Sequence, residues 1–270
     1  MVTTYGGRTF DRIERVDPRS FDHLWAATVY VSAEDKVLQS EIDALTKRVA
    51  ALEAAVTPAP APAPTPPAPS YVRWSNGTVL DQGQTGMCVG YAWAGFAETG
   101  PHAEPIVVGK GGDDESSTAD AIYDQARKDD GDANIEDPQG GASTTGGASA
   151  AKQLGFIKSY SWVLNVSQMR AALKAGPLVG GFPWRSTMFT PGTAFVLDVG
   201  DKSKDVGGHE FVIVGDIPAG TPGGPSQTED MAEMLNSWGL GWANGGRAYI
   251  PWDGVADLLA DGGDCTAPVR

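Results

Sequence analysis

The hydrophobic positions of residues 34–56 repeat as a heptad pattern. Apolar side chains recur at spacings of 4, 3, 4, 3 and 4 residues, at Leu38, Ile42, Leu45, Val49, Leu52 and Val56. Ile or Val at position a with Leu at position d favours a parallel dimer, although three heptads specify the number of chains weakly and a trimer stays open. Arg48 and Glu53 take a g position and the following e position, where they could pair between parallel chains. The pattern predicts a coiled-coil helix that makes the protein a homo-oligomer; the alternative is one amphipathic helix docked on its own chain.

A different pattern follows this helix. Residues 57–70 consist mostly of Ala and Pro. The repeated prolines cannot continue a helix. Such a sequence favours a stiff polyproline spacer of about 43 Å, at about 3.1 Å per residue. The spacer would separate the predicted coiled coil from residues 71–270, where the remaining hydrophobic sequence predicts one compact domain.

Residues 1–33 lack a regular hydrophobic period. They combine basic and aromatic side chains, at Arg8, Arg12, Arg15, Arg19, Tyr5, Phe10, Phe21 and Trp25. A segment of this composition favours ordering on a partner surface over folding alone. We predict that residues 1–33 form an anchor that docks on a larger assembly, of which a phage particle is one example.

Within residues 71–270, two hydrophobic runs begin directly after a chemically active residue. The Ala-rich run 89–97 predicts a buried helix, and Cys88 stands at its start. The β-branched run 210–215 predicts a strand, and His209 immediately precedes it. These placements predict a thiol at the positive end of a helix dipole and an imidazole held by a rigid strand.

Those residue types suit acyl transfer by a thiolate. A cysteine with an ordinary pKa is mostly protonated at neutral pH, so it needs a helix N-terminus and an imidazolium beside it. His209 would take the thiol proton and later deliver it to the leaving amine. Asn236 would accept the second imidazole N–H, and Trp238 would shield that hydrogen bond from water.

The three motifs around these residues resemble the active site of papain-like cysteine proteases. They read Asp-Gln-Gly-Gln-Thr-Gly-Met-Cys at 81–88, Gly-Gly-His at 207–209 and Leu-Asn-Ser-Trp-Gly at 235–239. The resemblance implies that Gln82, six residues before Cys88, donates its side-chain amide to the oxyanion. It also implies that Gly140 and Gly141 pair with an extended substrate, and Trp238 is grouped with them as a candidate substrate contact.

The spacing of the motifs fits the family, with some departures. His209 and Asn236 follow Cys88 by 121 (209 − 88) and 148 (236 − 88) residues, against the roughly 130–150 typical of papain and the cathepsins. The interval of 27 (236 − 209) between them is longer than usual, and the turn-forming segment 218–230 is interpreted as an inserted loop. The family's Cys-Gly-Ser-Cys-Trp is replaced here by Thr-Gly-Met-Cys-Val at 85–89. These features favour a divergent prokaryotic or phage branch.

The fold that the resemblance implies is α+β with two lobes. A mainly helical lobe carries Cys88 at the head of its central helix, and an antiparallel, β-barrel-like lobe carries His209 and Asn236. The predicted domain order is therefore a 1–33 anchor, a 34–56 coiled coil, a 57–70 linker and a 71–270 protease domain. The implied activity is that of a cysteine endopeptidase acting on a peptide or protein substrate. The predicted coiled coil at 34–56 would tether this enzyme to a larger assembly. Two alternatives stay open: a catalytically silent papain-fold structural or binding protein, and acyl transfer by the same residues.

The composition limits the classes of molecule that this protein is expected to bind. A net charge of −14 argues against nucleic acid and anionic membranes, because phosphate binding requires clustered Lys and Arg. Cys88 and Cys265 are the only cysteines, and we expect both to be reduced, because a bridge would silence the nucleophile. No signal peptide or membrane span is recognisable, so cytoplasmic synthesis is expected, with virion association as an extension of the anchor hypothesis. The chemistry requires no cofactor or metal, and the acidic run 112–115 is interpreted as a solvated loop.

The heptad pattern yields a first testable prediction. We expect the full chain to be a dimer or trimer at micromolar concentration by light scattering, and a chain lacking residues 1–56 to be monomeric. A monomeric full-length protein would show that the heptad helix does not hold chains together.

Overall fold

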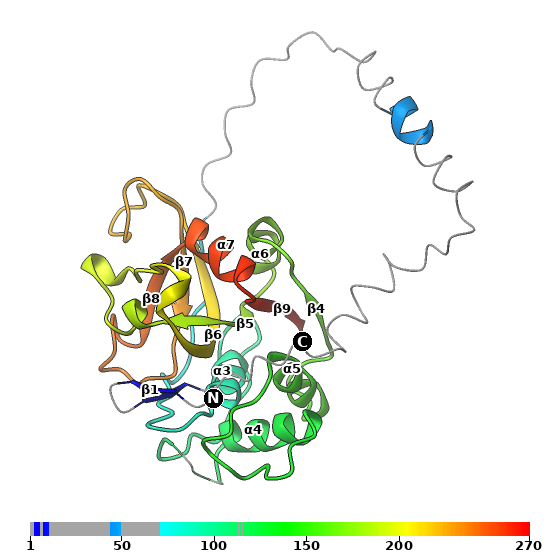
Figure 1. Cartoon of the computed structure of the whole chain (residues 1–270), viewed down its shortest axis with the longest axis vertical. Coiled ribbons are helices and arrows are strands. Elements are labelled where there is room, and N and C mark those ends of the chain that lie inside the picture. Colours follow the sequence, from blue (N-terminus) through cyan, green and yellow to red (C-terminus); the bar gives the residue numbers. More distant parts are fainter. Residues whose placement is uncertain (1–2, 6–7, 11–43, 50–70, 113, 115) are drawn as a thin grey trace. The chain divides into compact units, whose positions relative to one another are not determined.

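The computed structural model describes residues 3–5, 8–10, 44–49, 71–112, 114 and 116–270 (Figure 1). The chain divides into two units, one of Met1–Arg15 with Ser70–Arg270 and one of Val16–Pro69. In the second unit, residues 44–49 are helical, as the heptad pattern predicts, and Leu45 and Val49 are exposed. The rest of the predicted coiled coil and the whole proline-rich linker lie outside the described residues. Self-association therefore stays a prediction.

The first unit includes a short hairpin near the N-terminus. Strand β1 (Thr3–Tyr5) pairs antiparallel with β2 (Arg8–Phe10), with Tyr5 opposite Arg8. No regular hydrophobic pattern in residues 1–33 predicts these strands. The Gly-Gly pair at 6–7 was the available signal, because two glycines between short strands favour a tight hairpin connection.

Three helices form the helical lobe: α3 (Cys88–Ala97), α4 (Thr118–Asp129) and α5 (Thr144–Gln153). All ten residues of α3 are buried, so α3 is the central helix that the apolar run predicted. Gly90 allows α4 to approach closely, because a Cβ at this position would overlap with the carbonyl oxygen of Ala119. Among the described residues, no helix combines the length and apolar content needed to cross a bilayer.

A seven-stranded antiparallel sheet forms the second lobe. Its strand order is β4-β9-β5-β6-β7-β8, and β3 pairs with β6 off this path. The strands are β3 (Val72–Arg73), β4 (Ser159–Trp162), β5 (Leu178–Arg185), β6 (Asp205–Ile217), β7 (Met231–Leu235), β8 (Arg247–Pro251) and β9 (Asp264–Val269). Helices α6 (Val166–Leu173) and α7 (Trp252–Ala260) belong to this lobe. The predicted insertion at 218–230 is the connection between β6 and β7, and it consists of turns and bends.

The sheet is apolar on both faces. Along β6, Val212 and Val214 belong to the core that contains α3, whereas Phe211 and Ile213 belong to the core that contains α6 and α7. Alternate residues of a strand point to opposite faces, so β6 is buried on both sides. Figure 1 shows α3, α4 and α5 on one side of the sheet and α6 and α7 on the other.

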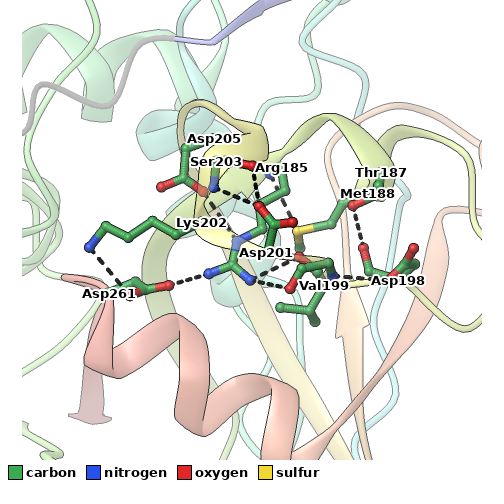
Figure 2. A network of polar contacts seen from close by, with 11 residues as sticks. Arg185, Thr187, Met188, Asp198, Val199, Asp201, Lys202, Ser203, Asp205 and Asp261 are labelled. Carbon is green, nitrogen blue, oxygen red and sulfur yellow. Dashed lines mark hydrogen bonds and ion pairs between the residues drawn. The ribbon is translucent and has the colours of Figure 1, made fainter.

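A buried arginine organises the segment that leads into β6. Arg185, at the end of β5, is 2% exposed and donates to the carbonyl oxygens of Val199 and Gly200 at 2.9 and 2.8 Å. Its guanidinium also contacts the carboxylates of Asp205, at 3.1 Å, and Asp261 (Figure 2). One side chain therefore joins β5, the start of β6 and the end of α7.

Replacing Arg185 tests how much this side chain contributes to stability. We expect Arg185→Met to lower the free energy of unfolding by about 3 kcal/mol, because the charged hydrogen bonds are lost. The two carboxylates are about a quarter exposed, so their hydration in the variant partly offsets this loss. Lys202→Met is the matched control. Lys202 reaches the same Asp261 from solvent and should contribute less than about 0.5 kcal/mol. Equal urea midpoints for the two variants would contradict this assignment.

Candidate active site

Cys88 is the first residue of α3 and is 1% exposed. Side-chain oxygens cap the N-termini of α4, α5 and α6, at Ser117, Ser143 and Asn165. Helix α3 has no side-chain cap, and its preceding residue is Met87. Without a side-chain cap, the first backbone N–H groups of a helix remain available to donate to a nearby anion, and the helix dipole favours negative charge there. The position of Cys88 is therefore suited to a thiolate.

His209 and Asn236 are in direct contact. The imidazole Nε2 lies 2.7 Å from the side-chain oxygen Oδ1 of Asn236, and both residues are buried. An amide oxygen can only accept, so Nε2 carries the proton and Nδ1 is the nitrogen left for chemistry. The backbone N–H of Ser237 also donates to Oδ1, at 2.8 Å, and fixes the orientation of the asparagine.

Aromatic rings enclose this pair. The Trp238 ring lies 4.8 Å from the His209 ring, centre to centre, and Trp184 lies 4.9 Å from it edge to face. Trp238 also stacks on Phe189 at 5.7 Å and is 3% exposed. The predicted shielding role of Trp238 agrees with this packing, because it places apolar surface against the imidazole. Its grouping with substrate contacts stays a prediction.

Gln82 is bound to the loop that carries Asn236. Its backbone N–H donates to the carbonyl oxygen of Ser237 at 2.9 Å, and its side-chain oxygen accepts from the Ser237 hydroxyl at 2.7 Å. The side-chain nitrogen is thereby turned the other way and donates to the carbonyl of Thr85, three residues before Cys88, at 2.8 Å. The sequence did not predict this role of Ser237, although the residue lies within the Asn-Ser-Trp-Gly motif.

Gly140 and Gly141 lie in the loop before α5. A hydrogen bond joins this loop to the loop before Cys88. Gly86 donates its backbone N–H to the carbonyl of Pro138 at 2.7 Å. The buried Arg127 donates to the carbonyl of Gly141 at 2.8 Å and to that of Asn134 at 2.6 Å. The Gly141 carbonyl is thus directed toward α4, a constraint that no sequence pattern indicated.

The second cysteine is chemically isolated. Cys88 and Cys265 are both free thiols, and Cys265 is fully buried on β9. Burial raises the pKa of the Cys265 thiol well above its ordinary value, and the neighbouring Asp264 and Glu210 raise it further. Among the described residues, no cluster of His, Cys, Asp and Glu has the makings of a metal site.

The described residues thus bring most of the predicted positions into one region. His209 contacts Asn236 and Trp238, and Gln82 is bonded to the neighbour of Asn236. Cys88 begins the helix that packs against β6, the strand of His209. Cys88 at the start of its helix and the His209–Asn236 pair are consistent with the catalytic triad of papain-like cysteine proteases.

Solved structures share this fold. Xylellain, a cysteine protease from Xylella fastidiosa, is 18% identical over 75% of this chain and 86% of its own, with a TM-score of 0.54. Bromelain from Ananas comosus in complex with the E64 inhibitor is 16% identical, over 75% and 99% of the two chains, with a TM-score of 0.51. Procathepsin L 3 of the Tenebrio molitor larval midgut is 15% identical, over 78% and 73%, with a TM-score of 0.53.

No protein-family model matches this sequence, and no curated protein matches it significantly. The structural similarities establish the papain-like fold, with a helical lobe and an antiparallel sheet.

The loop of Gly140 offers a test of the local packing. A Cβ on Gly140 would overlap with the guanidinium of Arg127, which its backbone partners hold in place. We expect Gly140→Ala to lower the free energy of unfolding by about 1–3 kcal/mol. Gly241→Ala is the matched control, because nothing lies within 4 Å of its added Cβ. If both alanine variants unfold at the parent urea midpoint, Arg127 does not constrain this loop.

Proposed function

We propose that this protein is a cysteine endopeptidase in which Cys88 attacks the carbonyl carbon of a peptide bond. The observation that carries the proposal is the 2.7 Å contact between His209 and Asn236, in a papain-like fold whose central helix begins at Cys88. His209 takes the thiol proton and later gives it to the leaving amine.

The hydrogen bond between His209 and Asn236 supports this assignment. Because Nε2 donates to Asn236, the other ring nitrogen, Nδ1, exchanges the proton with Cys88. Asn236 accepts a hydrogen bond from the imidazole in both of its protonation states, so it fixes the ring without competing for the proton. The surrounding tryptophans keep water from that hydrogen bond and strengthen it.

Gln82 is the proposed oxyanion donor. Its amide oxygen is occupied by the Ser237 hydroxyl, which directs the amide nitrogen away from Ser237 and toward the loop that leads to Cys88. An oxyanion donor must be fixed before charge develops, and losing one typically lowers kcat by about 100- to 1,000-fold. Ser237 is therefore a positioning residue for Gln82.

The reaction passes through a thioester. Cys88 forms a bond to the substrate acyl carbon, the amine leaves with the proton from His209, and water then releases the acid. The heptad pattern and the proline-rich spacer support a tethered protease, carried by residues 1–33 on a larger assembly such as a phage particle. Its substrate would be a peptide or protein within reach of that tether.

Covalent labelling tests the proposed nucleophile. An epoxysuccinyl inhibitor of the E64 type should add once to the parent chain, at Cys88, and the mass increase should disappear in His209→Ala. The buried Cys265 is an internal control and should stay unmodified, because burial raises its pKa. The measurement is intact mass followed by peptide mapping at pH 6.

Two results would contradict the proposal. Equal labelling of parent and His209→Ala would show a reactive thiol without an imidazole partner. No labelling of the parent would favour a papain-fold domain that binds or supports other proteins without turnover.

A further inference from the structure

A cavity of about 170 Å³ lies in the helical lobe, beside the segment that leads to Gln82. Residues 79–81, which directly precede Gln82, line one side of it. Tyr91 and Ala94 line a second side, and both belong to α3, the helix that begins at Cys88. The cavity therefore borders the two segments that carry the proposed nucleophile and the proposed oxyanion donor.

The loop between α3 and α4 forms the outer side of the cavity. Val107 and Val108 line the cavity from this loop and are 59% and 47% exposed, so the cavity opens to solvent here. Thr118, the first residue of α4, holds the loop in place. Its Oγ1 accepts from the Val107 N–H at 2.8 Å, and its own N–H donates to the Val107 carbonyl at 3.0 Å.

Gly112 joins this loop to both other sides of the cavity. Its N–H donates to the carbonyl of Asp81 at 3.1 Å, and its carbonyl accepts from the Tyr91 hydroxyl at 2.7 Å. Gly111 allows the close approach, because its φ is +91° and an added Cβ would lie 2.8 Å from the Asp81 carbonyl oxygen. The loop, α3 and the segment before Gln82 are thus connected around the cavity, and these contacts keep it from closing.

The lining of the cavity favours a neutral apolar ligand. Its apolar side chains include those of Val79, Leu80, Ile106 and Ala119. Lys110 and Asp81 are its charged residues, one of each sign, so the lining as a whole does not favour an anion or a cation.

The volume of the cavity sets the size of the ligand. Atoms that line an empty space lack packing partners, and a ligand that fills the space restores those contacts. An apolar cavity of about 150 Å³ is large enough to bind benzene. A space of 170 Å³ therefore suits one small ring or one short branched chain.

We infer that this cavity is a second binding site, for a neutral, mostly apolar molecule of about six to eight non-hydrogen atoms, and that its occupancy stabilises the segment before Gln82. None of the four proposed catalytic residues lines the cavity, so the site is separate from the proposed active site. The inference does not depend on peptide hydrolysis.

Binding of p-cresol to the full chain tests the site. We expect saturable binding with a Kd below about 1 mM by ligand-observed NMR titration. Benzoate has a similar size and a negative charge, and should bind at least about tenfold more weakly. Binding of p-cresol that does not saturate would overturn the site, and equal affinities for the two probes would overturn its preference for neutral ligands.

Two matched pairs of variants locate the binding. Ala119→Leu fills part of the cavity and should weaken p-cresol binding by at least about tenfold, whereas Ala121→Leu, at an exposed position of the same helix, should change it by less than about twofold. Val108→Thr replaces a methyl group of the lining with a hydroxyl at a half-exposed position and should weaken binding by about threefold. Val269→Thr makes the same change at a similarly exposed position on β9 and should have no effect. Equal affinities within both pairs would overturn the assignment to this cavity.

Hydrogen exchange tests the effect on the segment before Gln82. The N–H groups of Gly112 and Gln82 are hydrogen-bonded to Asp81 and Ser237. Saturating p-cresol should slow their exchange by at least about threefold more than that of the Lys158 N–H between β4 and β9, because a ligand suppresses the opening of the segments that it contacts. Equal changes at the three amides would overturn the stabilisation. None of these measurements requires turnover, so their failure would leave the proposed function intact.

Discussion

The burial of α3 against the sheet is the constraint on which the other features depend. The helix is surrounded on all sides, with α4 held close at Gly90 and with Val212, Val214 and Leu235 of the sheet in the same core. A buried helix that contacts neighbours all round cannot slide or rotate without opening cavities, and core cavities are costly. Packing along the whole helix therefore fixes the position of Cys88. The helix packs against β6, and β6 carries His209.

Polar contacts then connect loops that packing alone would leave free. Ser237 joins the loop before Cys88 to the loop of Asn236, and Arg127 holds the glycine loop from α4. Arg185 performs the same task at the start of β6. Each of these side chains is buried, so its hydrogen bonds are protected from competing water and hold the loops in one conformation.

The sequence predicted the local elements of this arrangement well. The apolar run after Cys88 predicted α3, and the turn formers at 218–230 predicted the long connection after β6. The strand around His209 is longer than predicted, because β5 and β7 pair with polar and glycine residues that have low strand propensity on their own. Contacts such as that of Gln82 with Ser237, or the pairing of Gly181 with Glu210 and with Asp264, depend on strand register and on loops far apart in the chain. A single sequence contains no local signal for them.

The long connection between β6 and β7 has a consequence for how such proteins are recognised. His209 and Asn236 lie near the same end of this hairpin, and residues 218–230 form its opposite end. Residues can be added there without changing the distance between imidazole and amide. The number of residues between His and Asn thus measures the length of a hairpin and carries no chemical information. Proteins of this architecture can therefore diverge in that interval while the site stays fixed, and the distal turn is a natural place for the fold to acquire new surface.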